Sequence, residues 1–234
     1  MRFADTHLHM TEKSVSYGYP DLGEAELLFS CSAQREDWGP LKDLTIPNIV
    51  RFYGIHPGYA DQWNTSTRDA LSAIISEDPD ARIGEIGLDG KHDAMDRQLA
   101  AFTEQVVMAS RHCRTINVHD IGCEGDILKI LKKYGKGCRS IILHSFKGVS
   151  VRQYEGLECY FSINPRILGK SEEHIRDIVG AIPLDRLVLE SDAPFTSREF
   201  VSMGSFIDRL SQIMGMPAGE LAETALRNAR RSVQ

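Results

Sequence analysis

Short apolar runs alternate with helical patterns along most of this 234-residue chain, and the alternation limits the fold more than any other feature. Eight runs are nearly continuous in apolar residues, as parallel strands covered on both faces are. They are residues 2–9, 26–32, 49–56, 81–88, 115–119, 140–144, 157–164 and 186–192. The repeated alternation predicts an α/β fold, a closed (β/α)8 TIM barrel, with an open doubly wound sheet as the alternative.

Several segments between or after these runs carry apolar residues at the spacing of amphipathic helices. They are residues 95–112, 125–134, 171–182, 199–215 and 217–232. No linker rich in proline, glycine or serine interrupts the pattern, so the sequence predicts a single domain over residues 1–234.

Composition excludes some functional classes. The formal net charge of −6 argues against a protein that coats nucleic acid through a broad basic face. The five cysteines are odd in number and include no C-x-x-C pair, so we expect free thiols in a cytoplasmic location. We see no signal peptide, and no apolar run approaches the ~20 residues of a membrane span.

Histidines and carboxylates stand at the C-terminal ends of the expected strands. In a TIM barrel these ends meet at one rim, where active sites are built. The six candidate metal ligands are His7, His9, Glu85, His119, His144 and Asp192. Because one ion takes about three or four protein ligands, this surplus indicates two divalent ions (Zn, Mn or Mg) that share a carboxylate. Asp5 lies one pleat deeper and is expected to be a buried hydrogen-bond partner.

Short motifs in the same order resemble those of the TatD family of metal-dependent deoxyribonucleases, whose barrel is related to the amidohydrolases. The motifs are DTHLH (5–9), GIHP (54–57), GEIGLD (84–89), NVHD (117–120), LHSFKG (143–148), LESDAP (189–194) and RNARR (227–231). The resemblance spans almost the whole chain. It implies a TIM barrel that hydrolyses phosphodiester bonds of DNA, as an exonuclease, through a metal-activated water.

The resemblance also implies two groups of metal ligands that share Glu85 as a bridge. The first group is His7, His9, Glu85 and Asp192. The second group is Glu85, His119 and His144. Asp192 would in addition orient or deprotonate the attacking water, which makes Asp192 and Glu85 the expected catalytic residues.

Three further residues are expected to bind the substrate. By resemblance, His56 contacts the region of the scissile phosphate. Lys147 and Arg166 follow the sixth and seventh expected strands, so they can overhang the rim and supply positive charge for a phosphate.

Two departures from the family pattern leave alternatives open. Asp120 follows His119 where the family often has a basic residue nearby, and the segment after Pro194 is short, passing through residues 196–199 into an expected helix. The alternatives are a dinuclear amidohydrolase-like enzyme acting on a small ester, lactone or amide, and a non-catalytic metal-binding scaffold. We expect DNA or a small phosphoester as substrate, with no membrane and no obligate protein partner.

Overall fold

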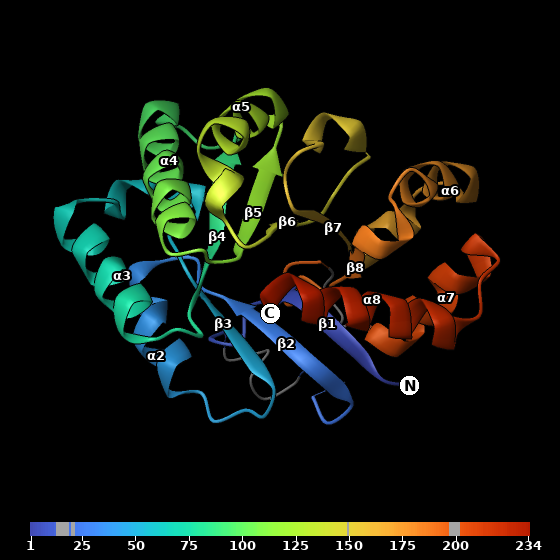
Figure 1. Cartoon of the computed structure of the whole chain (residues 1–234). Coiled ribbons are helices and arrows are strands. Elements are labelled where there is room, and N and C mark those ends of the chain that lie inside the picture. The colour runs from blue at the N-terminus through green and yellow to red at the C-terminus, as the bar shows by residue number, and fades with distance from the viewer. Residues whose placement is uncertain (13–18, 20–21, 149, 197–201) are drawn as a thin grey trace.

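The computed structural model, which describes residues 1–12, 19, 22–148, 150–196 and 202–234, contains one sheet of eight parallel strands (Figure 1). Neighbours along the chain pair in sequence order from β1 to β8. The strands are β1 (Phe3–Leu8), β2 (Ala25–Cys31), β3 (Ile49–Tyr53), β4 (Arg82–Asp89), β5 (Ile116–Ile121), β6 (Ile141–Leu143), β7 (Cys159–Ile163) and β8 (Leu187–Leu189). The eight predicted strands are therefore confirmed.

The first and last strands meet just beyond the end of β8. The amide of His9 donates to the carbonyl oxygen of Ala193, and the amide of Asp192 donates to that of His7, both at 2.9 Å. Leu8 and Ala193 form a parallel bridge at the same place. The barrel is nearly closed as predicted, and the open-sheet alternative is wrong.

Helices surround the sheet (Figure 1). The α-helices are α2 (Trp38–Asp43), α3 (Thr65–Glu77), α4 (Met95–Arg111), α5 (Glu124–Tyr134), α6 (Glu172–Gly180), α7 (Met203–Met214) and α8 (Ala218–Val233). Short 3-10 helices are Arg35–Asp37, Pro57–Gln62, Gly135–Gly137, Val151–Tyr154, Pro165–Gly169 and Leu184–Arg186. The helix expected over 199–215 is described from Met203 onward, because residues 197–201 lie outside the described part. No helix that the structure describes has the length and apolar character needed to cross a bilayer.

Helix α8 covers the N-terminal end of the barrel. Its Leu226 and Ala229 pack with side chains inside the barrel, among them Phe29 and Phe52. The carbonyl oxygen of Ser232 accepts hydrogen bonds from the Thr115 and Ser140 hydroxyl groups, which precede β5 and β6. With this end filled, the opposite rim, where the candidate ligands stand, is left for binding.

Gly87 on β4 is required by the close approach of β5. A Cβ atom at Gly87 would lie 1.9 Å from the carbonyl oxygen of His119, and the backbone φ of +154° is one that other residues rarely adopt. We expect Gly87→Ala to destabilise the fold by about 1–3 kcal/mol or more, measured as a lower urea midpoint. Gly219→Ala on α8 is the control, since no atom lies within 4 Å of its added Cβ. Equal midpoints for the two variants would contradict the packing argument.

Candidate metal centre

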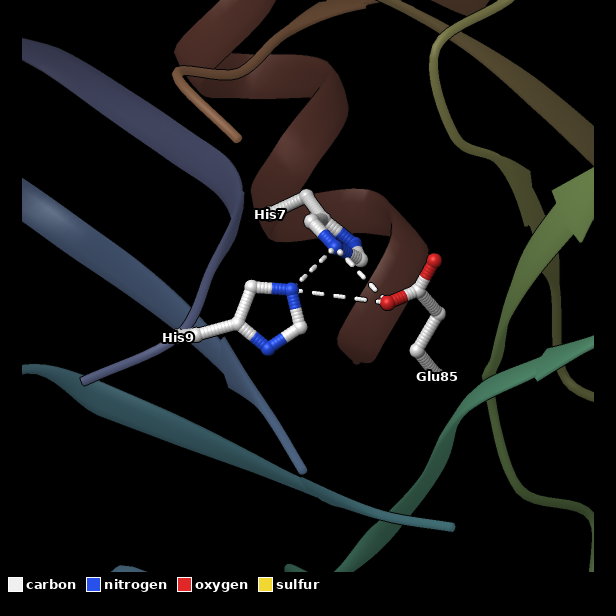
Figure 2. A group of neighbouring side chains, drawn as sticks. All are labelled: His7, His9 and Glu85. Carbon is white, nitrogen blue, oxygen red and sulfur yellow. Dashed lines mark hydrogen bonds and ion pairs between the residues drawn. The ribbon is translucent and has the colours of Figure 1, made fainter. Parts of the chain in front are cut away.

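Three of the expected ligands converge at the rim of the barrel. His7 comes from β1, His9 follows β1 directly, and Glu85 comes from β4 (Figure 2). Oε2 of Glu85 lies 3.4 Å from Nε2 of His7 and 3.4 Å from Nε2 of His9. The two histidine Nε2 atoms are 3.2 Å apart. These separations suit atoms that surround one cation.

The other carboxylate oxygen of Glu85 faces a different set of imidazoles. Oε1 lies 2.7 Å from Nδ1 of His119, 3.7 Å from Nε2 of His144 and 3.8 Å from Nε2 of His56. Glu85 thus belongs to two groups whose possible ligand atoms all lie within 4.8 Å of one another, one with His7 and His9 and one with His56 and His119. A carboxylate shared in this way can bridge two ions.

Charge in the cluster favours a divalent cation. Burial acts to raise the pKa of Glu85, but the neighbouring His56 and His7 outweigh it and hold that pKa well below its usual value. Burial, reinforced by His7, lowers the pKa of His9 to about 3. Burial also lowers the pKa of His56 to about 4, against the attraction of Glu85. Against burial, Cys31 and Glu85 raise the pKa of His7, and Glu85 and Asp89 raise that of His119. A divalent cation displaces such protons when it binds, so the ionised carboxylate and the surrounding imidazoles are a donor set for Zn²⁺, Mn²⁺ or a similar ion.

Asp192 lies at the edge of the cluster. Its Oδ1 is 3.9 Å from Nε2 of His7, and its Oδ2 is 3.3 Å from the Arg166 guanidinium. Burial raises the pKa of Asp192, opposed by His144 and His7 and aided by the Glu190 and Glu85 charges. A carboxylate with a raised pKa is a better proton acceptor near neutral pH.

His56 is close to the second group but presents the wrong atom for metal binding. Its Nδ1 accepts a hydrogen bond from the amide of Gly58 at 3.0 Å. In the neutral ring the proton is then on Nε2, the atom that faces Glu85. His56 therefore offers an N–H donor to the cavity, which agrees with a substrate contact better than with a ligand.

Glu190 was missed by the sequence reasoning, which selected only Asp192 from the LESDAP motif. The Glu190 side chain is 0% exposed, and its Oε1 lies 2.8 Å from Nδ1 of His144. Oε1 also accepts hydrogen bonds from the Ser145 amide (2.8 Å) and the Asn164 amide group (3.2 Å). A carboxylate behind a histidine turns the other ring nitrogen toward the metal and fixes its orientation. The glutamate within the LESDAP motif was the sequence feature that could have indicated this residue.

Two other carboxylates support the cluster. Asp5 accepts hydrogen bonds from the Tyr19 hydroxyl at 2.6 Å and the Ser191 amide at 2.9 Å, which confirms its expected role as a buried partner. Asp89 accepts from the amide of Lys91 at 2.8 Å, as a loop-capping residue does. Its second oxygen lies 3.2 Å from Nε2 of His119, a contact that the sequence did not indicate.

A cavity of about 440 Å³ opens over the cluster. Arg166 and His56 line it, as do two exposed rings, Tyr59 (38% exposed) and Phe195 (55% exposed). Lys147 lines a smaller neighbouring cavity of about 20 Å³, and its Nζ lies 3.4 Å from the carbonyl oxygen of Asp120. Of the expected cationic substrate contacts, Arg166 is therefore beside the cluster, and Lys147 is beside the adjacent hollow.

The barrel and the histidine–carboxylate cluster at its C-terminal rim define a metallohydrolase-type TIM barrel. The sequence profile described as TatD related DNase matches residues 4–234, and the chain belongs to this family.

Curated relatives carry related names. The 3'-5' ssDNA/RNA exonuclease TatD of Erwinia tasmaniensis is 27% identical over 76% of this chain and 75% of that protein. The enzyme of the same name from Erwinia amylovora is 29% identical, and the match spans 57% of its length and 61% of this chain. The uncharacterized metal-dependent hydrolase YabD of Bacillus subtilis is 26% identical over 78% of this chain and 76% of its own.

A solved structure agrees on the fold. The crystal structure of YjjV, a TatD homolog from Escherichia coli, superposes with a TM-score of 0.83 at 21% identity, covering 98% of this chain and 96% of that one. At this identity the similarity speaks for the fold alone.

Proposed function

We propose that this protein is a divalent-metal-dependent nuclease that removes nucleotides from the 3′ end of single-stranded DNA or RNA. The observation that carries the proposal is the position of Glu85, whose Oε2 faces His7 and His9 and whose Oε1 faces His119 and His144, beneath a cavity of about 440 Å³. The printed name of the Erwinia tasmaniensis relative supports the choice of substrate.

The residues present fit two divalent ions. His7, His9, Glu85 and Asp192 would hold one, and Glu85, His119 and His144 would hold the other. When bound, such ions lower the pKa of water and neutralise charge that develops on the phosphate. The buried carboxylate of Glu190 adds negative charge behind His144, which favours a cation nearby.

The protein's own groups account for the remaining steps of the proposal. Asp192, with its raised pKa, accepts the proton of the attacking water. The His56 N–H and the Arg166 guanidinium are the donors that hold the phosphate oxygens. The exposed rings of Tyr59 and Phe195 at the cavity can stack on terminal bases. Lys147 remains a predicted contact for a longer nucleic-acid strand that extends past the neighbouring cavity of about 20 Å³.

Asp120, which the sequence sets against phosphate binding, is engaged elsewhere. Its Oδ1 accepts a hydrogen bond from the amide of Cys123 at 3.0 Å, just before α5 begins.

The volume of the cavity over the cluster, about 440 Å³, is within the range of small-ligand sites, roughly 300–1,000 Å³. This keeps hydrolysis of a small ester, lactone or amide as the second candidate function.

The five cysteines support a cytoplasmic location in this proposal. Cys31, Cys113, Cys123, Cys138 and Cys159 are all free thiols. Free thiols are typical of proteins kept in a reducing compartment.

A metal-restoration assay separates the candidates. The protein is stripped with chelator, reloaded with Mg²⁺, Mn²⁺ or Zn²⁺ singly, and given 5′-labelled single-stranded DNA and RNA, a generic phosphodiester and a lactone. We expect metal-dependent shortening of the 5′-labelled strands one nucleotide at a time. Turnover of the small substrates alone would support the amidohydrolase-like alternative, and bound metal without any hydrolysis would support the scaffold.

A further inference from the structure

Asn117 lies directly behind His7, on the side away from the cluster. It is fully buried on β5, two residues before His119. Its Oδ1 lies 2.9 Å from Nδ1 of His7, and its Nδ2 donates to the carbonyl oxygen of Thr6 at 3.0 Å. In the sequence, Asn117 is distinguished only by its place in the NVHD motif.

The hydrogen bond to Thr6 determines which way the Asn117 amide points. A carbonyl oxygen only accepts hydrogen bonds, so the NH2 group of Asn117 must face Thr6 and the oxygen must face His7. An amide oxygen is also only an acceptor, so Nδ1 of His7 carries a proton. The alternative tautomer would place two lone pairs opposite each other at 2.9 Å.

A protonated Nδ1 leaves the lone pair of the neutral His7 ring on Nε2. That atom lies 3.2 Å from Nε2 of His9, 3.4 Å from Oε2 of Glu85 and 3.9 Å from Oδ1 of Asp192. The available lone pair is therefore directed into the cluster. His56 has the opposite tautomer. The amide of Gly58 donates to its Nδ1, so the proton of the neutral ring is on Nε2.

We propose that Asn117 is a positioning residue that selects the His7 tautomer able to bind the metal ion. The inference rests on the metal centre of the proposed function and adds a residue that sets its affinity. Cys31, whose Sγ lies 3.5 Å from the same Nδ1, is a weak acceptor and does not oppose this tautomer.

The sheet holds Asn117 in place. Its backbone pairs with Ile142 of β6, and on the other side its Cβ packs against Gly84 of β4. A Cβ at Gly84 would lie 2.8 Å from the Asn117 Cβ, so the missing side chain provides the space that Asn117 fills. A side chain in the middle of a sheet is held in one rotamer by its neighbours. A residue that selects a tautomer needs such a fixed position, because its oxygen must stay opposite the same ring nitrogen.

The first test is nuclear magnetic resonance of the zinc-loaded full chain labelled with ¹⁵N-histidine. We expect the His7 ring to show a proton on Nδ1 and none on Nε2, and the His56 ring to show the reverse. A His7 ring protonated on Nε2 would overturn the proposal without any variant being made.

The second test measures zinc retention against a graded series of chelators. Asn117→Leu removes the acceptor at nearly the same volume, and we expect its zinc affinity to fall about 10–100-fold. Asn117→Asp keeps an acceptor oxygen toward Nδ1 and should recover most of that loss. Wild-type affinity in a folded Asn117→Leu variant would overturn the proposal, as would equal losses in both variants.

Asn228 supplies the matched control. It is also a fully buried asparagine, and its Nδ2 donates to the carbonyl oxygens of Leu184 and Leu187 at the opposite end of the barrel. Asn228→Leu should lower stability but leave zinc affinity unchanged. Absence of nuclease activity in a protein that passes these tests would refute the proposed function and leave the role of Asn117 standing.

Discussion

Glu85→Ala is expected to lose both ions and to reduce nucleic-acid cleavage by about 10³-fold or more. One carboxylate oxygen faces His7 and His9 and the other faces His119, so a single truncation removes a shared oxygen donor from both groups. It also removes the carboxylate that faces both groups of buried imidazoles and helps to balance the divalent charge. The loss is at least that of one strong transition-state-stabilising group.

Metal content by elemental analysis and initial rates on labelled single-stranded DNA check this result together. Glu85→Gln keeps the volume of the side chain and separates loss of charge from loss of packing. Glu223→Ala is the control, because Glu223 contacts Arg2 at the protein surface on α8. Full metal content in Glu85→Ala would show that the carboxylate does not join the two groups.

Asp192→Asn is expected to keep at least one ion while kcat falls by about 10²–10⁴-fold, with KM changed much less. The amide preserves the shape of the side chain and its closeness to Arg166, but it cannot accept the proton of the attacking water. Its place at the edge of the cluster, 3.9 Å from Nε2 of His7, makes it less important for metal retention than Glu85.

The pH profile of kcat provides a second test of whether Asp192 is the general base. A general base must be ionised to act, so the rate should fall as the pH drops through its pKa. Because burial raises that pKa above the ordinary value of an aspartate, the acid limb should begin at a higher pH than for an exposed aspartate. Asp192→Asn should lose this limb. A near-normal rate in the variant would place the base on another residue.

The strands could be predicted from sequence because both faces of each are covered, which leaves nearly unbroken apolar runs. Their ends were less well defined. The run 186–192 contains β8 only over Leu187–Leu189, and the contact with β1 is made by Asp192 and Ala193 beyond the end of that strand. Helix α3 was not predicted because only Thr67, Leu71 and Ile75 are buried along its 13 residues.

Most of the candidate ligands could be predicted because they stand at or near strand ends, and strand ends meet in a barrel. Glu85 differs, because it lies in the middle of β4 and not at its end. The groups behind the ligands could not be predicted. Asn117 and His7 come from β5 and β1, and nothing in their spacing indicates that an amide oxygen faces an imidazole nitrogen. Glu190 was visible within a motif, but its contact with His144 depends on how β8 lies relative to the end of β6.

The packing of α8 against the N-terminal end of the barrel has a consequence for the order in which the chain is synthesised and folds. All six candidate ligands precede residue 193, whereas the helix that fills the other end begins at Ala218. During synthesis the ligand-bearing strands therefore leave the ribosome before the segment that covers the apolar interior on the far side. Until that helix is synthesised, Phe29 and Phe52 lack the packing of Leu226 and Ala229, so this end of the barrel can be completed only after all six ligands have been made.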